Sequence, residues 1–297
     1  MRNVIIITLL IVSAAFWGCS DNADDVTGGE DDNLTRYIVV PLERPTIQSA
    51  VDVANRGDTI LVVDGTYTGP GNRDIVFSGK SVVLMSENGA EATIIDLQGS
   101  VDVPHLGFDF ADVDESSTVI DGFTIRNGYS AQGSGMNFKS AAPTVKNCVF
   151  YNNAGTVSGG AIRCKSAAPR FVNCTFVSNS APTGGTIMLI ATSAPVFENC
   201  IITLSTGGEA VTCSDTFSEA TFSCSNVFGN EMGDWSGCLA AQAGLDGNMS
   251  TDPMFCEPSV GNFTLDQESP CAAANNSCGV LIGALGAGCG GTAASGS

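Results

Sequence analysis

Three copies of one short motif decide the fold: SAAPTVKNCVF at residues 140–150, SAAPRFVNCTF at 166–176 and SAPVFENCII at 193–202. Their prolines stand at 143, 169 and 195, so each step is 26 residues. Within each period apolar residues alternate over three or four positions before a cluster of Gly, Asn or Pro, a pattern typical of short strands. The sequence therefore predicts an all-β solenoid with coils of about 24–26 residues, each stacked about 4.8 Å from the next through parallel strands.

The repeat resembles the right-handed parallel β-helix of the pectin lyase-like superfamily, with the resemblance covering residues 37 to about 290. The segments at 159–162 and 176–179 are also similar to the repeats of chlamydial polymorphic outer-membrane proteins. The resemblance implies one parallel β-helix over residues 37–235. In the pectin-processing enzymes the binding cleft runs along the outer face of the parallel strands, and the same use of that face is expected here.

A capping helix is predicted at the start of the coil. Four residues have the spacing of one apolar helix face: Ile47, Ala50, Val51 and Ala54. Thr46 directly precedes them and is a favourable N-cap residue. Such a helix would cover strand edges that are otherwise unpaired.

Two ladders are expected where the motif copies stack. Asn147, Asn173 and Asn199 fall where strand alternation breaks, and Asn tolerates the left-handed backbone of a sharp bend. Their stacked side chains should hydrogen-bond along the ladder in the interior. The cysteines that follow should form a buried ladder of core thiols: Cys148, Cys174 and Cys200, with Cys224 beyond. A metal site is disfavoured, because a row of thiols does not close a tetrahedron and none belongs to a C-x-x-C pair.

The two ends of the chain differ from the coils. Residues 236–290 contain five cysteines in a less regular sequence and are predicted to form a disulfide-stapled C-terminal cap, with the pairing left open. Residues 291–297 are expected to be a disordered tail. Residues 1–18 have a short basic start and an apolar run, and the junction with Cys19 resembles the lipobox of bacterial lipoproteins.

This resemblance implies that residues 1–18 are a lipoprotein signal peptide and that Cys19 is lipidated; an ordinary signal peptide is the alternative. Residues 19–36 are expected to be a flexible acidic tether. Ser20 is not the Asp that favours inner-membrane retention, which implies a lipoprotein of the bacterial outer membrane. The acidic stretch after Cys19 is similar to the surface-export tethers of some bacterial lipoproteins, which implies exposure on the cell surface.

Charge divides the chain unevenly. With 31 acidic and 12 basic residues the net charge is −19, which excludes whole-protein attraction to nucleic acid. Residues 122–197 nevertheless contain only basic charges. Strand alternation places four polar residues outward on one sheet, with Lys165 above Lys139 and Arg163 above Asn137. Together with Arg126 these residues are the candidate ligand-binding set for an acidic polysaccharide or cell-surface glycan, and a solvated face without a ligand is the alternative.

Candidate chemistry is sparse. Asp109, Asp112 and Asp114 form a weak candidate Ca²⁺ site, and no other cofactor is expected. The single histidine, His105, lies outside any catalytic motif, so the catalytic residues are unknown. The favoured function is noncatalytic binding at the cell surface. Two alternatives are a pectate lyase-like polysaccharide lyase or glycoside hydrolase, and an envelope stalk without a ligand.

Overall fold

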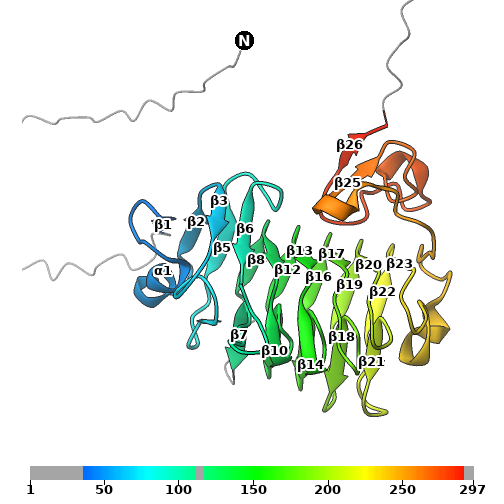
Figure 1. The fold of residues 1–297 in the computed structure, drawn as a ribbon, viewed down its shortest axis with the longest axis horizontal. Helices are drawn as coiled ribbons and strands as arrows, with labels where there is room; N and C mark the ends of the chain where they lie inside the picture. Colours follow the sequence, from blue (N-terminus) through cyan, green and yellow to red (C-terminus); the bar gives the residue numbers. More distant parts are fainter. Residues whose placement is uncertain (1–35, 112–116, 291–297) are drawn as a thin grey trace, which may run out of the picture. The chain divides into compact units, whose positions relative to one another are not determined.

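The computed structural model describes residues 36–111 and 117–290, which form a parallel β-solenoid (Figure 1). Three parallel sheets run along it, each receiving one strand from nearly every coil. The first sheet has the order β1 (Tyr37–Val40), β2 (Thr59–Val62), β5 (Val83–Ser86), β8 (Val119–Asp121), β12 (Thr144–Lys146), β16 (Arg170–Val172), β19 (Val196–Glu198) and β22 (Thr221–Ser223).

The second sheet contains β3 (Gly65–Tyr67), β6 (Thr93–Asp96), β9 (Thr124–Arg126), β13 (Val149–Tyr151), β17 (Thr175–Val177), β20 (Ile201–Thr203) and β23 (Asn226–Phe228). The third sheet contains β4 (Ile75–Val76), β7 (Phe108–Ala111), β11 (Met136–Lys139), β15 (Ile162–Lys165), β18 (Ile187–Ile190) and β21 (Val211–Cys213). A smaller pair, β10 (Tyr129–Gln132) and β14 (Ala154–Ser158), precedes the third sheet in its coils.

The observed register agrees with the predicted period in the first sheet. Val145 pairs with Phe171, and Phe171 pairs with Phe197, each 26 residues on. The side chains at this position fill the interior, where the Phe171 and Phe197 ring centroids are 4.8 Å apart and those of Phe197 and Phe222 are 4.5 Å apart. Stacked aromatic rings at one strand spacing therefore continue the repeat into the core.

The register of β18 departs by one residue from the predicted 26-residue step. A constant step would place Met188 and Ile190 over Ile162 and Cys164 in the core, but Ile162 pairs with Ile187, and Met188 pairs with Arg163. One residue is missing from the turn before β18, and the turn after it holds an additional left-handed residue, Thr192, with φ of 63°. The two changes compensate, so the 26-residue step survives although the inward and outward residues of β18 are exchanged.

Helix α1 (Ile47–Val53) packs against β1, β2 and β4, near the β1 end of the solenoid (Figure 1). The Thr46 side chain accepts a hydrogen bond from Ser49 N, and the Ser49 side chain accepts one from Thr46 N. Ile47, Ala50 and Val51 are buried in the core, as the apolar spacing predicts. No helix in the described ranges is long and apolar enough to cross a membrane.

The segment predicted as a cap, residues 236–290, has two parts. The first contains the 3₁₀ helix η1 (Gly237–Gln242), which lies against β21 and β22: Leu239 is fully buried, and Gln242 Oε1 accepts a hydrogen bond from Phe222 N. The second part, residues 250–290, is called the C-terminal module. It lies against the outer face of the second sheet rather than over the end of the coil (Figure 1).

The C-terminal module contains a small sheet of β24 (Phe255–Glu257), β25 (Asn262–Asp266) and β26 (Ala287–Cys289), with two 3₁₀ helices, η2 (Pro258–Val260) and η3 (Ala273–Asn275). Its Phe263 packs with Val149 and Val177, and its Leu265 and Ile282 pack with Ile201. Val149, Val177 and Ile201 are therefore buried although they face outward from β13, β17 and β20, because another part of the chain covers them.

Candidate functional site

The outer face of the third sheet carries a row of polar residues. Asp109, Asn137 and Arg163 occupy one register position on β7, β11 and β15, and Lys139 and Lys165 occupy another. We call these five residues the polar row. Four of them are the outward residues predicted from the sequence, with Lys165 opposite Lys139 and Arg163 opposite Asn137 in the pairing.

A continuous hydrogen-bond chain runs through the polar row. Arg163 Nη1 donates to Asn137 Oδ1 over 3.2 Å, and Asn137 Nδ2 donates to Asp109 Oδ1 over 2.7 Å. Lys139 Nζ lies 3.7 Å from Asp109 Oδ2. Asn137 is 6% exposed and Arg163 is 7% exposed. These hydrogen bonds therefore lie beneath the surface, while Lys139 and Lys165 are more exposed to solvent.

The burial of Arg163 has a local cause in the turn before the third sheet. Gly133 has φ of +59°, and a Cβ built on it would lie 2.9 Å from Arg163 N and 3.0 Å from Arg163 Cβ. This close approach of the turn to the backbone of β15 requires glycine. Burial lowers the pKa of the Arg163 guanidinium, and its neighbours Cys164 and Asp109 act in the opposite direction.

Lys139, Arg163 and Lys165 lie at neighbouring positions of the polar row and repel one another. Asp109 supplies a carboxylate from within the same face. One carboxylate faces three cations, so the polar row still carries an excess of positive charge. Lys165 is exposed, and its Nζ has no ion-pair or hydrogen-bond partner among the residues that the structure describes.

The candidate Ca²⁺ site does not fit the described residues. Asp109 uses its carboxylate oxygens on Asn137 and Lys139, and an ammonium group beside it opposes a cation. Within residues 36–111 and 117–290, no three His, Cys, Asp or Glu side chains are grouped as a metal site requires. Asp112 and Asp114 lie outside the described residues.

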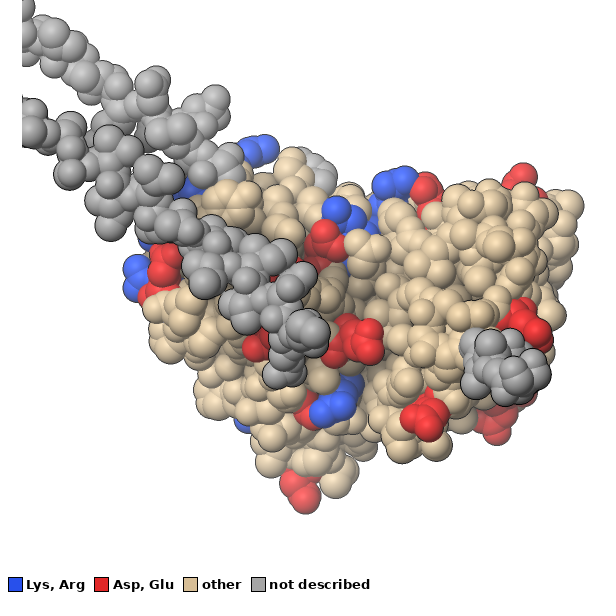
Figure 2. Space-filling model, turned by 90° about the horizontal axis from the view of Figure 1, so that it is seen from above, with Lys and Arg blue, Asp and Glu red and all other residues tan. Residues whose placement is uncertain are grey.

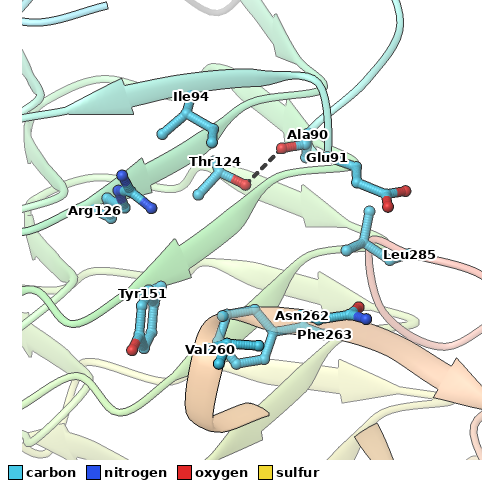
Figure 3. A pocket seen from close by; sticks show the side chains of 11 residues that line it. Ala90, Glu91, Ile94, Thr124, Arg126, Tyr151, Val260, Asn262, Phe263 and Leu285 are labelled. Atoms are coloured by element: carbon cyan, nitrogen blue, oxygen red, sulfur yellow. Dashed lines mark hydrogen bonds between the residues drawn. The ribbon is translucent and has the colours of Figure 1, made fainter. Parts of the chain in front are cut away.

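Arg126 is separated from the other predicted ligand residues. It lies on β9 of the second sheet, and its Nε donates to Asp96 Oδ2 over 2.9 Å. Its side chain borders a cleft of about 290 Å³ between the second sheet and the C-terminal module (Figure 3). The cleft is lined by Ala90, Glu91, Ile94, Thr124, Arg126, Tyr151, Val260, Gly261, Asn262, Phe263 and Leu285.

The three predicted ladder asparagines adopt left-handed backbone angles, with φ of 53° at Asn147, 49° at Asn173 and 53° at Asn199. Their side chains are not in the interior: Asn147 is exposed and the other two are half-buried. Asn199 Nδ2 lies 3.5 Å from Asn173 Oδ1, but Asn147 Nδ2 donates to Asp121 instead. These residues therefore form a ladder of turns with only one amide contact along it.

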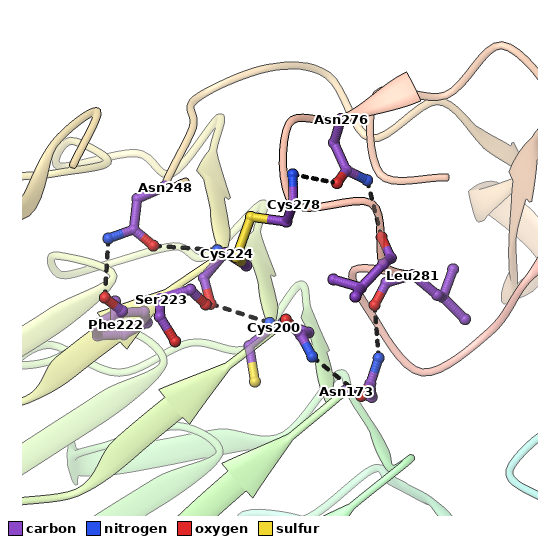
Figure 4. The surroundings of a disulfide bond; sticks show 12 residues. Asn173, Cys200, Phe222, Ser223, Cys224, Asn248, Asn276, Cys278 and Leu281 are labelled. Carbon is purple, nitrogen blue, oxygen red and sulfur yellow. Dashed lines mark hydrogen bonds between the residues drawn. A yellow bond between two sulfur atoms is a disulfide. The ribbon is translucent and has the colours of Figure 1, made fainter. Parts of the chain in front are cut away.

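Two of these asparagines hold the C-terminal module. Asn173 Nδ2 donates to Leu281 O over 2.6 Å, and Asn199 O accepts a hydrogen bond from Gly283 N over 2.8 Å. The disulfide between Cys224 and Cys278 joins the same surfaces covalently (Figure 4). The turn ladder thus acts as a docking line for residues 278–283.

Cys148, Cys174 and Cys200 are completely buried, and burial raises the pKa of the Cys148 and Cys174 thiols well above the ordinary value. The prediction that Cys224 is the fourth member of this thiol ladder is wrong. Cys224 has φ of 45° and follows Asn199 in the turn ladder, while Ser225 takes the position beyond Cys200 and accepts a hydrogen bond from Cys200 N. The shift follows from the 25-residue step between β19 and β22.

Three disulfides are present in the described residues: Cys213–Cys238 joins β21 to η1, Cys224–Cys278 joins the turn ladder to the C-terminal module, and Cys256–Cys289 lies within that module. The sequence left their pairing open because no spacing specifies it. Cys271, which was expected to share in the stapling, is instead a free buried thiol, like Cys164 and the three ladder thiols.

A second asparagine ladder was not foreseen. Asn153 and Asn179 are fully buried, and Asn179 Oδ1 accepts hydrogen bonds from Asn153 N over 3.0 Å and from Asn153 Nδ2 over 3.1 Å. Asn179 Nδ2 donates to Phe150 O over 2.9 Å. This second ladder could have been predicted from the sequence, because Asn153 and Asn179 are separated by the same 26 residues as the motif copies.

His105 belongs neither to the polar row nor to the asparagine ladders. Its Nδ1 lies 2.6 Å from Asp74 Oδ2, and its Nε2 is buried without a partner in the described part of the chain. His105 also forms an antiparallel bridge with Tyr129. This arrangement fixes a connection between coils rather than presenting an acid or base to solvent.

Charges on the face seen from above are mixed in the middle and purely acidic toward one end (Figure 2). The acidic end agrees with residues 171–297, which contain Asp and Glu but no Lys or Arg. The basic groups are accordingly concentrated in the earlier coils.

Comparison with known families agrees with this geometry. Residues 81–249 match the family model described as "Right handed beta helix region". Because this match covers more than half of the chain, the protein belongs to the right-handed β-helix family. None of the curated proteins matches the sequence.

Proposed function

We propose that this protein is an exported, lipid-anchored β-helix that binds an acidic polysaccharide or cell-surface glycan without catalysing a reaction on it. The observation that carries the proposal is the pairing of Lys139 with Lys165 on the outer face of the third sheet. Lys139 and Lys165 lie on neighbouring strands, and the buried Arg163 lies on the same face. Together they form a positive strip on an acidic protein.

The chemistry of the strip suits a chain of carboxylates or sulfates. Lys165 is unpaired among the described residues, and the 3.7 Å separation between Lys139 Nζ and Asp109 Oδ2 leaves that ammonium group able to accept a second anion. The Arg163 guanidinium is fixed by its hydrogen bond to Asn137, so it adds positive charge to the site but does not reach out to the ligand. A polyanion lying along the solenoid axis would meet both lysines in succession.

Export is supported by the three disulfides, since disulfides persist in oxidising compartments. Lipidation at Cys19 and placement on the bacterial outer membrane rest on the lipobox resemblance, and residues 1–35 lie outside the described residues. Labelling of the wild-type protein with a palmitate analogue, lost in Cys19→Ala, tests this part. An unlabelled wild-type protein would contradict it.

The glycan proposal is tested by retention of the purified protein on immobilised polygalacturonate, alginate and heparin at increasing salt. We expect binding that weakens with salt, and a loss of about five- to tenfold in affinity in the Lys139→Ala/Lys165→Ala variant. Lys146→Ala is the matched control, because Lys146 lies on the first sheet and pairs with Asp121.

Two results would overturn the proposal. Indifference to all three polyanions would leave the envelope stalk as the function. Formation of unsaturated products or new reducing ends with Ca²⁺ present, abolished by Arg163→Ala, would instead make the protein a lyase or hydrolase.

A further inference from the structure

The cleft beneath the C-terminal module differs in chemistry from the polar row. One wall is the outer face of β6, β9 and β13, and the other is formed by residues 260–263 with Leu285 (Figure 3). The two walls come from segments more than one hundred residues apart in the sequence. The cleft therefore exists only where the C-terminal module is docked.

The cleft walls combine apolar side chains with one accessible aromatic ring. Ile94, Val260 and Leu285 supply aliphatic surface. Tyr151 is half-buried and meets Phe263 edge-to-face, with the ring centroids 4.9 Å apart. Gly261 has φ of +83°, and a Cβ on it would lie 3.8 Å from Tyr151 Cε1, so the loop runs close beside the ring.

Several polar groups at the cleft lack partners in the described part of the chain. The Asn262 amide is oriented by Thr264, whose N and Oγ1 both donate to Asn262 Oδ1, and this leaves Asn262 Nδ2 free. Arg126 uses only Nε on Asp96 and is 33% exposed. Tyr151 Oη and the Glu91 carboxylate have no hydrogen-bond partner within residues 36–111 and 117–290, so donors and acceptors are present together.

We propose that this cleft binds a neutral saccharide, at a site separate from the polar row. A pyranose ring has apolar C–H faces that pack on an aromatic ring and hydroxyl groups that both donate and accept hydrogen bonds. Saccharides offer both kinds of surface, and the lining of the cleft is polar and apolar in about equal parts.

Charge decides against an acidic ligand here. Asp96 already neutralises the Arg126 guanidinium, and the unpaired Glu91 repels a carboxylate. Arg126 Nη groups can still donate to a hydroxyl oxygen. The cleft and the polar row are on different sheets, so the two sites select different sugars without competing for the same residues.

The experiment is titration calorimetry on the disulfide-intact protein with cellotetraose, xylotetraose and N-acetylchitotetraose, and with tetragalacturonate as the acidic comparison. We expect at least one neutral oligosaccharide to bind. Tyr151→Leu should weaken that binding at least tenfold. Arg126→Gln is a second variant that spares the fold, because Asp96 keeps its hydrogen bond from Asn127, and it should weaken binding about fivefold.

Tyr129→Leu is the matched control, since Tyr129 is another half-buried tyrosine that lies outside this cleft. Neutral binding that persists in Lys139→Ala/Lys165→Ala while polygalacturonate retention is lost would support two independent sites. The inference fails if no neutral oligosaccharide binds at about 10 mM, or if both cleft variants bind as the wild type does. It also fails if tetragalacturonate binds more tightly than the neutral probes in Lys139→Ala/Lys165→Ala, where the polar row is removed. None of these failures bears on the polar row.

Discussion

The interior ladder of Asn153 and Asn179 allows the stability of the solenoid to be tested quantitatively. In Asn179→Ala the backbone N–H and Nδ2 of Asn153 lose the acceptor Asn179 Oδ1, and Phe150 O loses the donor Asn179 Nδ2. A buried N–H without a partner costs about 1–3 kcal/mol, and each of the two other lost bonds costs about 1 kcal/mol. We therefore expect the free energy of unfolding to fall by about 4 kcal/mol.

Asn152→Gly is the matched control for Asn179→Ala. Asn152 is exposed and has φ of 53°, which glycine adopts freely, and its side-chain Nδ2 donates to Asn127 Oδ1. Its loss should cost less than about 1 kcal/mol. The assay is urea unfolding followed by circular dichroism with the disulfides intact, together with hydrogen exchange at the Asn153 amide. Equal destabilisation by both variants, or unchanged protection of that amide, would refute the argument that the interior amides hold the coils together.

Two further predictions concern the cysteines. Cys224→Ser/Cys278→Ser should release the C-terminal module and lower stability by about 4 kcal/mol, since the disulfide closes a separation of 54 residues; chymotrypsin should then cut near Phe255 much faster than in the wild type, and equal cutting rates would contradict the prediction. Burial raises the pKa of Cys271 to about 11 from the ordinary 9.0. Because the unfolded thiol ionises at the lower pH, its contribution to stability is complete below pH 9 and declines as the pH rises toward 11. The thermal midpoint should therefore fall over that range, less steeply in Cys271→Ala, and parallel curves for the two proteins would exclude this cause.

The coils were predictable because each residue in them is paired with the residue one period away, which occupies the same position in the repeat. The period that brings Val145 over Phe171 also brings Asn173 to the left-handed turn of Asn147. The prediction was wrong where the period changes locally, as at Met188, because a one-residue deletion in a turn exchanges the two faces of the next strand. The predicted ligand-binding residues do not form one site for a similar reason. Arg126 and Arg163 belong to the same basic stretch of the sequence, but Arg126 lies on the second sheet and Arg163 on the third.

The repeat, the strand positions, the buried residues of most coils and the capping helix could be predicted from the residues alone, because these features depend on local alternation and on a constant step. The folded molecule was needed to show that the C-terminal module covers the second sheet, that Cys213 and Cys224 pair with Cys238 and Cys278, and that Asp109 lies beside Lys139. These contacts join segments that are not related by the period, or depend on how an outward side chain finds its neighbour. No spacing in the sequence encodes them, since they result from complementary surfaces that form only after the coils have stacked.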